Sequence, residues 1–137
     1  MERYLIDTNV LVNVFEHNLF NKDVKHILFD YSNKIYICSE CVKEFINLIQ
    51  IGKVGGKKHK QKIDVFDFIE NELGYVIKYI SKEHLKTLAK LEVIAGHGDP
   101  SDRLIVAHAI TEKIPIISSD TKFPNYIKCG LDLISNR

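Results

Sequence analysis

The feature of the sequence that most restricts its fold is a regular alternation of short apolar runs with segments of helical periodicity. The apolar runs have the length and the β-branched and aromatic content of buried strands, and they cover residues 3–7, 34–38, 75–80, 113–120 and 131–135. The segments with helical spacing cover residues 8–16, 21–33, 39–54, 63–73, 81–94 and 100–112. Strands that alternate with helices predict an α/β fold, a three-layer α/β/α sandwich with a central, mainly parallel sheet.

The length of 137 residues suits a single domain, 1–137, and no repeat or linker divides the chain. A formal net charge of +1 gives no whole-molecule attraction to nucleic acids or membranes. The N-terminal segment lacks the pattern of a secretory signal, and no apolar run approaches the ~18 residues of a membrane span. Three cysteines, an odd number, argue against a disulfide framework. We therefore expect a cytoplasmic protein that does not associate with membranes.

Four acidic residues lie just beyond the ends of predicted strands or near the starts of the helices that follow. They are Asp7, Glu44, Asp102 and Asp120. In open parallel sheets, ligands bind beyond the carboxyl ends of the strands, so these side chains are expected to meet at one edge. Taken singly, each could be a turn residue, a helix cap or a solvated side chain. Together they would repel one another unless a cation joined them, and Mg²⁺ or Mn²⁺ prefers such oxygen ligands.

Metal-dependent hydrolysis of a phosphodiester is the chemistry that such a cluster favours, because a bound cation lowers the pKa of water and stabilises the charge of the transition state. No set of histidines and cysteines indicates zinc. The sequence contains no GxxxxGK[ST] loop, no GxGxxG turn and no GxSxG elbow, so a P-loop, a dinucleotide site and a serine hydrolase are unsupported.

The stretch "HGDPSDRLIVAHAI" (97–110) places two aspartates at the start of a predicted buried helix. Asp99, before Pro100, has the pattern of an N-cap, whereas Asp102 lies one turn inside the helix and is expected to face the site. Because residues i and i+3 share a face, a metal-binding role for Asp99 as well stays open. We expect His97 to be a loop residue, with a contact to substrate as the alternative, and His108 to be a buried histidine with hydrogen-bond partners.

Five lysines form the one dense basic run of the sequence, and they are Lys53, Lys57, Lys58, Lys60 and Lys62. The run is either a solvated loop or a contact for a phosphate backbone beside the acidic site. Arg103 is likewise open to two interpretations, a structural salt bridge or a contact with an acid or a phosphate.

Four motifs in order along the chain resemble the PIN domain, and more narrowly its VapC-like toxins. They are "YLIDTNVLV", "SECVKEFINLIQIGKV", "HGDPSDRLIVAHAI" and "IISSDTKFPNY". The resemblance carries the four acids of the family onto Asp7, Glu44, Asp102 and Asp120, with Thr8, Asn9, Ser39 and Ser119 as supporting polar residues. Ser101 stands where the family often has an aromatic residue, a departure that concerns packing more than chemistry.

The resemblance implies a Mg²⁺- or Mn²⁺-dependent endoribonuclease that is the toxin of a toxin–antitoxin pair, with an antitoxin partner and homodimerisation. In that function Asp7, Asp102 and Asp120 hold the cation, and Glu44 completes its shell or helps to activate water. Two alternatives remain. One is a PIN nuclease of RNA processing that is not a toxin. The other is a receiver-like signalling domain, which also gathers acids around Mg²⁺ but needs a late lysine, for which Lys122 is a weak match.

Overall fold

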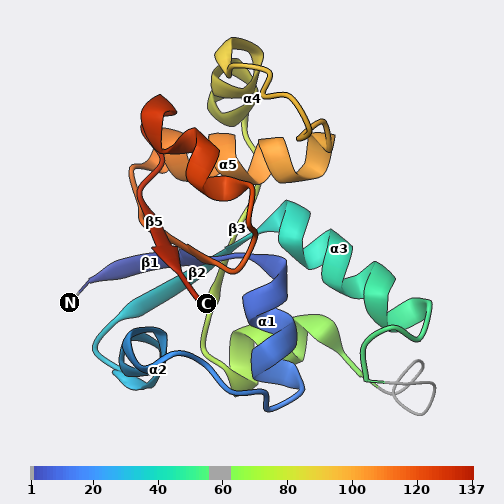
Figure 1. The fold of residues 1–137 in the computed structure, drawn as a ribbon. Coiled ribbons are helices and arrows are strands. Elements are labelled where there is room, and N and C mark those ends of the chain that lie inside the picture. Colours follow the sequence, from blue (N-terminus) through green and yellow to red (C-terminus); the bar gives the residue numbers. More distant parts are fainter. Residues whose placement is uncertain (1, 56–62) are drawn as a thin grey trace.

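A five-stranded parallel sheet with the strand order β3-β2-β1-β4-β5 runs through the molecule (Figure 1). The computed structural model describes residues 2–55 and 63–137. The strands are β1 (Arg3–Ile6), β2 (Lys34–Cys38), β3 (Val76–Lys78), β4 (Ile116–Ser118) and β5 (Leu133–Ser135). Each is one of the five predicted strands, and the predicted parallel pairing is confirmed.

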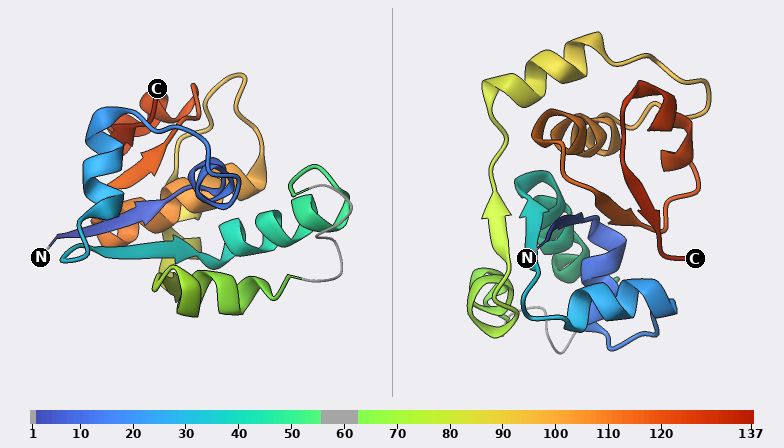
Figure 2. Two further views of the ribbon diagram at one scale, coloured as in Figure 1. Left: turned by 90° about the horizontal axis from the view of Figure 1, so that it is seen from below. Right: turned by 90° about the vertical axis from the view of Figure 1, so that its left-hand side faces the viewer.

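Helices cover both faces of this sheet. They are α1 (Thr8–Phe15), α2 (Lys22–Phe29), α3 (Ser39–Gln50), α4 (Lys82–Lys90) and α5 (Pro100–Glu112), with a π-helical segment η2 (Asp67–Glu72) and a 3-10 helix η3 (Phe123–Cys129). Figures 1 and 2 show α1, α2 and η2 on one side of the sheet and α4 and α5 on the other. This arrangement is the predicted three-layer α/β/α sandwich.

The apolar runs of the sequence form the core because the central strands are covered on both faces. Ile6 in β1 and Ile37 in β2 are fully buried, as is Ile117 in β4. The register pairs Ile6 with Ile37 on one side and with Ile117 on the other, so β1 is the middle strand. This packing fixes where β1 ends, and the residue that follows is Asp7.

Several predicted elements are longer than the observed ones. The strand expected over 113–120 begins only at Ile116, because Lys113 adopts a left-handed conformation (φ 56) that ends α5 and Pro115 cannot donate to a neighbouring strand. The helix expected over 21–33 ends at Phe29, where Asp30 accepts hydrogen bonds from the backbone and the hydroxyl of Ser32 and makes a turn.

The helix expected over 81–94 ends at Lys90, and Leu91 is extended. Residues 91–99 form a loop whose one ladder contact is an isolated bridge between Ile94 and His97. The sequence reading also missed η3, a short helix with a proline in its first turn. This loop and η3 both matter for the site described below.

Among the described residues, no helix combines the length and the apolar character that a membrane crossing requires. Cys38, Cys41 and Cys129 are all free, as the odd number of cysteines predicts.

Candidate active site

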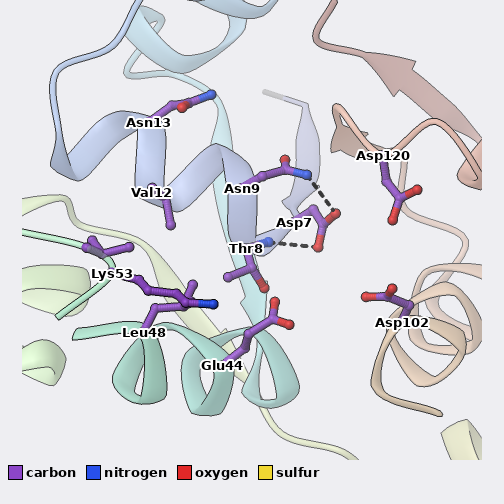
Figure 3. A pocket seen from close by; sticks show the side chains of 11 residues that line it. Asp7, Thr8, Asn9, Val12, Asn13, Glu44, Leu48, Lys53, Asp102 and Asp120 are labelled. Carbon is purple, nitrogen blue, oxygen red and sulfur yellow. Dashed lines mark hydrogen bonds between the residues drawn. The ribbon is translucent and has the colours of Figure 1, made fainter. Parts of the chain in front are cut away.

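All four predicted acids line one cavity of about 390 Å³ at the carboxyl edge of the sheet (Figure 3). Asp7 follows β1, Glu44 lies on the second turn of α3, Asp102 on the first turn of α5, and Asp120 follows β4. Figure 3 shows their carboxylates pointing into a common space from three sides. The four side chains thus meet at one edge of the sheet, as expected for residues that follow parallel strands.

Asp7 is the most deeply buried of the four, with 4% of its surface exposed. It is the N-cap of α1, since its Oδ1 accepts a hydrogen bond from the Thr8 backbone N–H at 2.7 Å. Its Oδ2 accepts from the Ser118 hydroxyl at 2.7 Å and from the Asn9 amide at 3.4 Å. Asp7 thus couples the start of α1 to β4.

Burial raises the pKa of Asp7 to about 7. The hydrogen bonds from Ser118 and Thr8 lower this pKa, but they do not compensate for burial, and the negative charges of Asp102 and Glu44 raise it further. A carboxylate in this position is costly to ionise by itself, and a bound cation would remove that cost.

Asp102 is half-buried, and its pKa is raised to about 6 by burial and then by the charges of Asp99, Asp120 and Glu44. Asp99 is the N-cap of α5, as predicted, because its Oδ1 accepts from the backbone N–H groups of Ser101 at 2.9 Å and Asp102 at 3.4 Å. It is exposed and lies outside the residues that line the cavity. The structure thus separates the two aspartates by position.

Ser118 is the polar residue at the site that the sequence reading overlooked. Its hydroxyl donates to Asp7 and accepts from the backbone N–H of Asp120 at 3.0 Å, so it joins two of the acids. Since Ile6 pairs with Ile117, the next residues along β1 and β4 are also neighbours. The register of two parallel strands was the signal that could have identified Ser118.

The other supporting residues lie at different distances from the acids. The backbone N–H of Ser119 donates to Asn9 Oδ1 at 3.3 Å, but its hydroxyl donates to the carbonyl of Asn136. Figure 3 shows the Thr8 hydroxyl pointing toward Glu44. Ser39 does not line the cavity; its hydroxyl accepts from the Ile80 backbone and ties the start of α3 to the end of β3.

Of the basic residues named above, Lys53 lies at the rim of the cavity. Lys57, Lys58, Lys60 and Lys62 lie outside the described residues. The guanidinium of Arg103 donates from Nη2 to the carbonyl of Leu91 at 3.0 Å, which holds the loop before α5. Within the described part of the chain it makes no ion pair, so the structural salt bridge is not observed.

Two groups of histidines and acids could hold a metal ion, which the sequence reading did not expect. In each, one ligand atom per residue lies within 4.8 Å of the others. The first, called here the His97 group, consists of His97, Asp102 and Asp120 and belongs to the acidic cavity. The second, the His84 group, consists of His84, His108 and Glu112. His108 is fully buried, yet neither ring nitrogen has a hydrogen-bond partner among the described residues, which contradicts the prediction of a satisfied histidine.

The residues of the acidic cavity fit a divalent cation by two observations. Four carboxylates converge on one space, and the buried one, Asp7, is destabilised in its charged form by its surroundings. Oxygen ligands of this kind suit hard cations of the Mg²⁺ and Mn²⁺ class. Asp7, Asp102 and Asp120 are the side chains that would hold the ion, with Glu44 beside them.

Comparisons with known proteins agree with the fold. The family model described as the PIN domain matches residues 4–128. No curated protein sequence matches the chain. The fold is similar to a crystal structure of VapBC2 from Rickettsia felis bound to promoter DNA, with a TM-score of 0.73 and 21% identity over 98% of this chain and 99% of that one.

Two further solved structures share the fold. VapBC from Salmonella typhimurium, bound to DNA, gives a TM-score of 0.70 at 14% identity and covers 98% of both chains. A toxin–antitoxin complex from Klebsiella pneumoniae gives a TM-score of 0.63 at 18% identity, over 96% of this chain and 95% of that one.

Proposed function

Because the chain belongs to the PIN domain family, a family of nucleases, we propose that it is a metal-dependent endoribonuclease and the toxin of a toxin–antitoxin pair. The observation that carries the proposal is the convergence of Asp7, Glu44, Asp102 and Asp120 in one cavity. Carboxylates on four different segments of the chain meet there only because the parallel sheet aligns the ends of its strands.

Each side chain has a role that follows from its position. Asp7 is fixed by three hydrogen bonds and cannot move far, so it anchors the cation from the floor of the cavity. Asp102 and Asp120 face it from α5 and from the end of β4. They would hold the cation together with Asp7. The cation, when bound, lowers the pKa of a water molecule and neutralises charge on the scissile phosphate.

Glu44 lies across from Asp102 in the cavity, on a different helix (Figure 3). From there it completes the ligand shell or accepts the proton of the attacking water, with the cation as its partner. Ser118 is a positioning residue, because its hydroxyl fixes the orientation of the Asp7 carboxylate and the backbone of Asp120.

An acidic cavity needs positive charge at its rim to attract a polyanion. Lys53 lies at this rim, and a contact with the phosphate backbone gives affinity that depends on salt and not on sequence. For Lys57, Lys58, Lys60 and Lys62, contact with the phosphate backbone stays a prediction.

The toxin role and the antitoxin partner rest on two observations. Structures with this fold include toxin–antitoxin complexes. In addition, a second cavity of about 1240 Å³ lies beside α1 and α2. Its lining mixes polar residues with apolar ones, and of the latter Leu19, Phe29 and Tyr31 are exposed. Large exposed apolar patches mark interaction surfaces, and we assign this one to an apolar segment of the antitoxin. Homodimerisation stays a prediction.

The alternative is a PIN nuclease that acts in RNA processing and is not a toxin. A gene for a small antitoxin next to the gene of this protein would argue against that alternative. If the product of such a gene is captured by the chain, Leu19→Glu and Tyr31→Glu should weaken capture without changing RNA cleavage. The receiver-like domain is not supported, because the PIN family model spans residues 4–128.

The central test is cleavage of a mixed RNA pool by the full chain with Mg²⁺ or Mn²⁺. Asp7→Asn and Asp102→Asn should lower the cleavage rate by about 100- to 1000-fold, because each removes a carboxylate that holds the cation. Asp23→Asn, at an exposed position in the first turn of α2, is the matched control. Cleavage that survives both substitutions or an excess of chelator contradicts the proposal.

A further inference from the structure

We propose that His97 is a nitrogen ligand of the cation in the acidic cavity, and that the cavity therefore binds a divalent transition ion such as Mn²⁺ in preference to Mg²⁺. This inference rests on the proposed function, since it concerns the same cation. It assigns a role to a residue that lies shortly before Asp99 and Asp102 in the sequence and that the sequence alone left open as a loop residue or a substrate contact.

The position of the imidazole is the first observation. His97 is 3% exposed, although it lies in the loop between α4 and α5. Its Nε2 is 3.5 Å from Asp102 Oδ2, and it shares with Asp102 and Asp120 a set of ligand atoms that all lie within 4.8 Å of one another. The ring thus directs its outer nitrogen at two of the carboxylates that would hold the cation.

The second observation is that this nitrogen has no hydrogen-bond partner in the described part of the chain. The contact with Asp102 does not have the geometry of a hydrogen bond. A buried polar atom without a partner costs about 1 to 3 kcal/mol, so such atoms are rare unless something else satisfies them. A cation held between the imidazole and the two carboxylates would satisfy Nε2 and both acids at once.

The third observation concerns the other ring nitrogen. His97 Nδ1 is hydrogen-bonded to the hydroxyl of Tyr126, a fully buried side chain of η3. A phenol hydroxyl can donate or accept. It can therefore accept from a protonated Nδ1, and this tautomer leaves the lone pair of Nε2 available for a metal ion. In ligating histidines, the ring nitrogen that does not bind the metal generally has a hydrogen-bond partner, which fixes the orientation of the ring and its tautomer.

The loop around His97 is also held in place. The His97 backbone N–H donates to the Ile94 carbonyl at 3.1 Å, and the Lys122 ammonium donates to the carbonyl of Gly96. The imidazole packs edge to face against Phe123 and Tyr126. A ligand that is ordered in advance loses little entropy when the ion binds, so the contribution of the imidazole to affinity is retained.

The expected consequence is selectivity. Mg²⁺ strongly prefers oxygen ligands, whereas an imidazole raises affinity for Mn²⁺ and for the later ions of the first transition row. A site with three aspartates, one glutamate and one imidazole nitrogen should therefore discriminate in favour of transition ions.

The experiment uses Mn²⁺ as the probe with the full chain. Pulsed electron paramagnetic resonance of the Mn²⁺-loaded protein should show coupling to a directly bound ¹⁴N nucleus. The coupling should persist in His26→Gln, a control at an exposed histidine of α2, and should disappear in His97→Gln. Titration should show that the ratio of Mn²⁺ to Mg²⁺ affinity falls by about 10- to 100-fold in His97→Gln and stays unchanged in His26→Gln.

Absence of nitrogen coupling in the unaltered protein overturns the inference, as does coupling that survives His97→Gln. Labelling the unaltered chain with ¹⁵N-histidine changes the coupling only if a histidine is bound, so the test does not depend on the folding of the variant. If Mn²⁺ does not bind, or if it binds to Asp102→Asn with unchanged affinity, the metal site of the proposed function is itself wrong. Mn²⁺ that binds through Asp102 without nitrogen coupling overturns only the role of His97.

Discussion

Each end of α5 has a group of histidine and acidic side chains, and the two groups differ in the hydrogen-bond partner of the histidine Nδ1. The His97 group lies at the N-terminal end and the His84 group at the C-terminal end. In the first, the inner nitrogen of the histidine faces a phenol hydroxyl. In the second, His84 Nδ1 accepts a hydrogen bond from the backbone N–H of Ser81 at 2.9 Å, in the capping box of α4.

A backbone N–H can only donate, so this contact fixes the tautomer of His84. Its proton must lie on Nε2, which donates to Glu112 Oε2 at 2.8 Å. Binding a metal at Nε2 would require the proton to leave and the cap of α4 to break. Glu112 already has a cation in the Lys78 ammonium at 3.3 Å. His97 is therefore the proposed ligand and His84 is not, because the partner of Nδ1 sets which tautomer each ring can adopt.

The largest expected difference between the two ends is in catalysis. Asp102→Asn should lower RNA cleavage by about 100- to 1000-fold, whereas Glu112→Gln should leave the rate within roughly twofold. Initial rates on one RNA substrate measure both effects, and circular dichroism confirms that both variants are folded. Equal losses at both ends would show that α5 acts through its stability and not through a metal site.

The second expected difference is in stability. Replacing Asp7 in the acidic cavity and Glu112 in the His84 group should change the free energy of unfolding in opposite directions. The folded-state pKa of Asp7, about 7, lies above its usual value of 3.8 because of burial. The stability that Asp7 contributes is therefore present below its unfolded pKa and is lost as the pH rises through 7. At about pH 8 and without metal, Asp7→Asn should raise the free energy of unfolding by about 2 to 4 kcal/mol.

Glu112 differs because His84 and Lys78 hold its pKa below the usual value, by hydrogen bonds in the first place. Glu112→Gln should lower the free energy of unfolding by about 1 to 2 kcal/mol. Urea denaturation in chelator at two pH values measures both variants, and the gain from Asp7→Asn should shrink as the pH falls toward 4. A loss of stability in Asp7→Asn at high pH would contradict the interpretation of Asp7.

The third prediction concerns His108, which stacks on His84 with ring centroids 4.0 Å apart. Burial, followed by the electrostatic effect of the neighbouring His84, lowers the pKa of His108 to about 4, while Glu112 raises it and Lys78 lowers it. The neutral form is favoured in the folded state, so the protein should lose stability as the pH falls from about 6.5 toward 4. His108→Phe should reduce this loss by about 2 kcal/mol.

Denaturation curves of the unaltered chain and of His108→Phe at several pH values between these limits measure the effect. Parallel losses in both proteins would mean that His108 is not buried in its neutral form.

The smallest expected difference separates two lysines. Lys53 lies at the rim of the acidic cavity, whereas Lys78 is paired with Glu112. Lys53→Gln should weaken RNA binding about threefold at moderate salt and reduce the slope of log affinity against log salt by roughly 0.7. Lys78→Gln should leave that slope unchanged, and titrations at three salt concentrations compare the two. An unchanged slope for Lys53→Gln would mean that this lysine does not contact phosphate.

The sequence was sufficient to predict the parallel sheet and the position of the four acids at its edge, for a physical reason. Strands and helices alternate clearly, and a parallel sheet necessarily brings the residues after its strands to one edge. Asp7 and Asp120 follow from that rule, and Asp102 follows from the helix start marked by Asp99 and Pro100. These are local signals, each readable within a few residues.

What the sequence did not reveal depends on contacts between distant segments. His97 joins the acids only because its loop packs on η3, and Tyr126, its partner, lies 29 residues further on. Ser118 contacts Asp7 across 111 residues. His84 and Glu112 meet only through the packing of α4 on α5. None of these contacts follows from periodicity, because periodicity shows which face of an element is buried and not what it meets.

The central position of β1 has a consequence for the time at which the cavity forms during synthesis. Asp7 is made well before Ser118, which follows it by 111 residues, and before Asp120. β1 pairs with β4 only after more than a hundred further residues have been added. A growing chain on the ribosome therefore carries an incomplete set of carboxylates until β4 and Asp120 have been added, and the cavity can form only after that point.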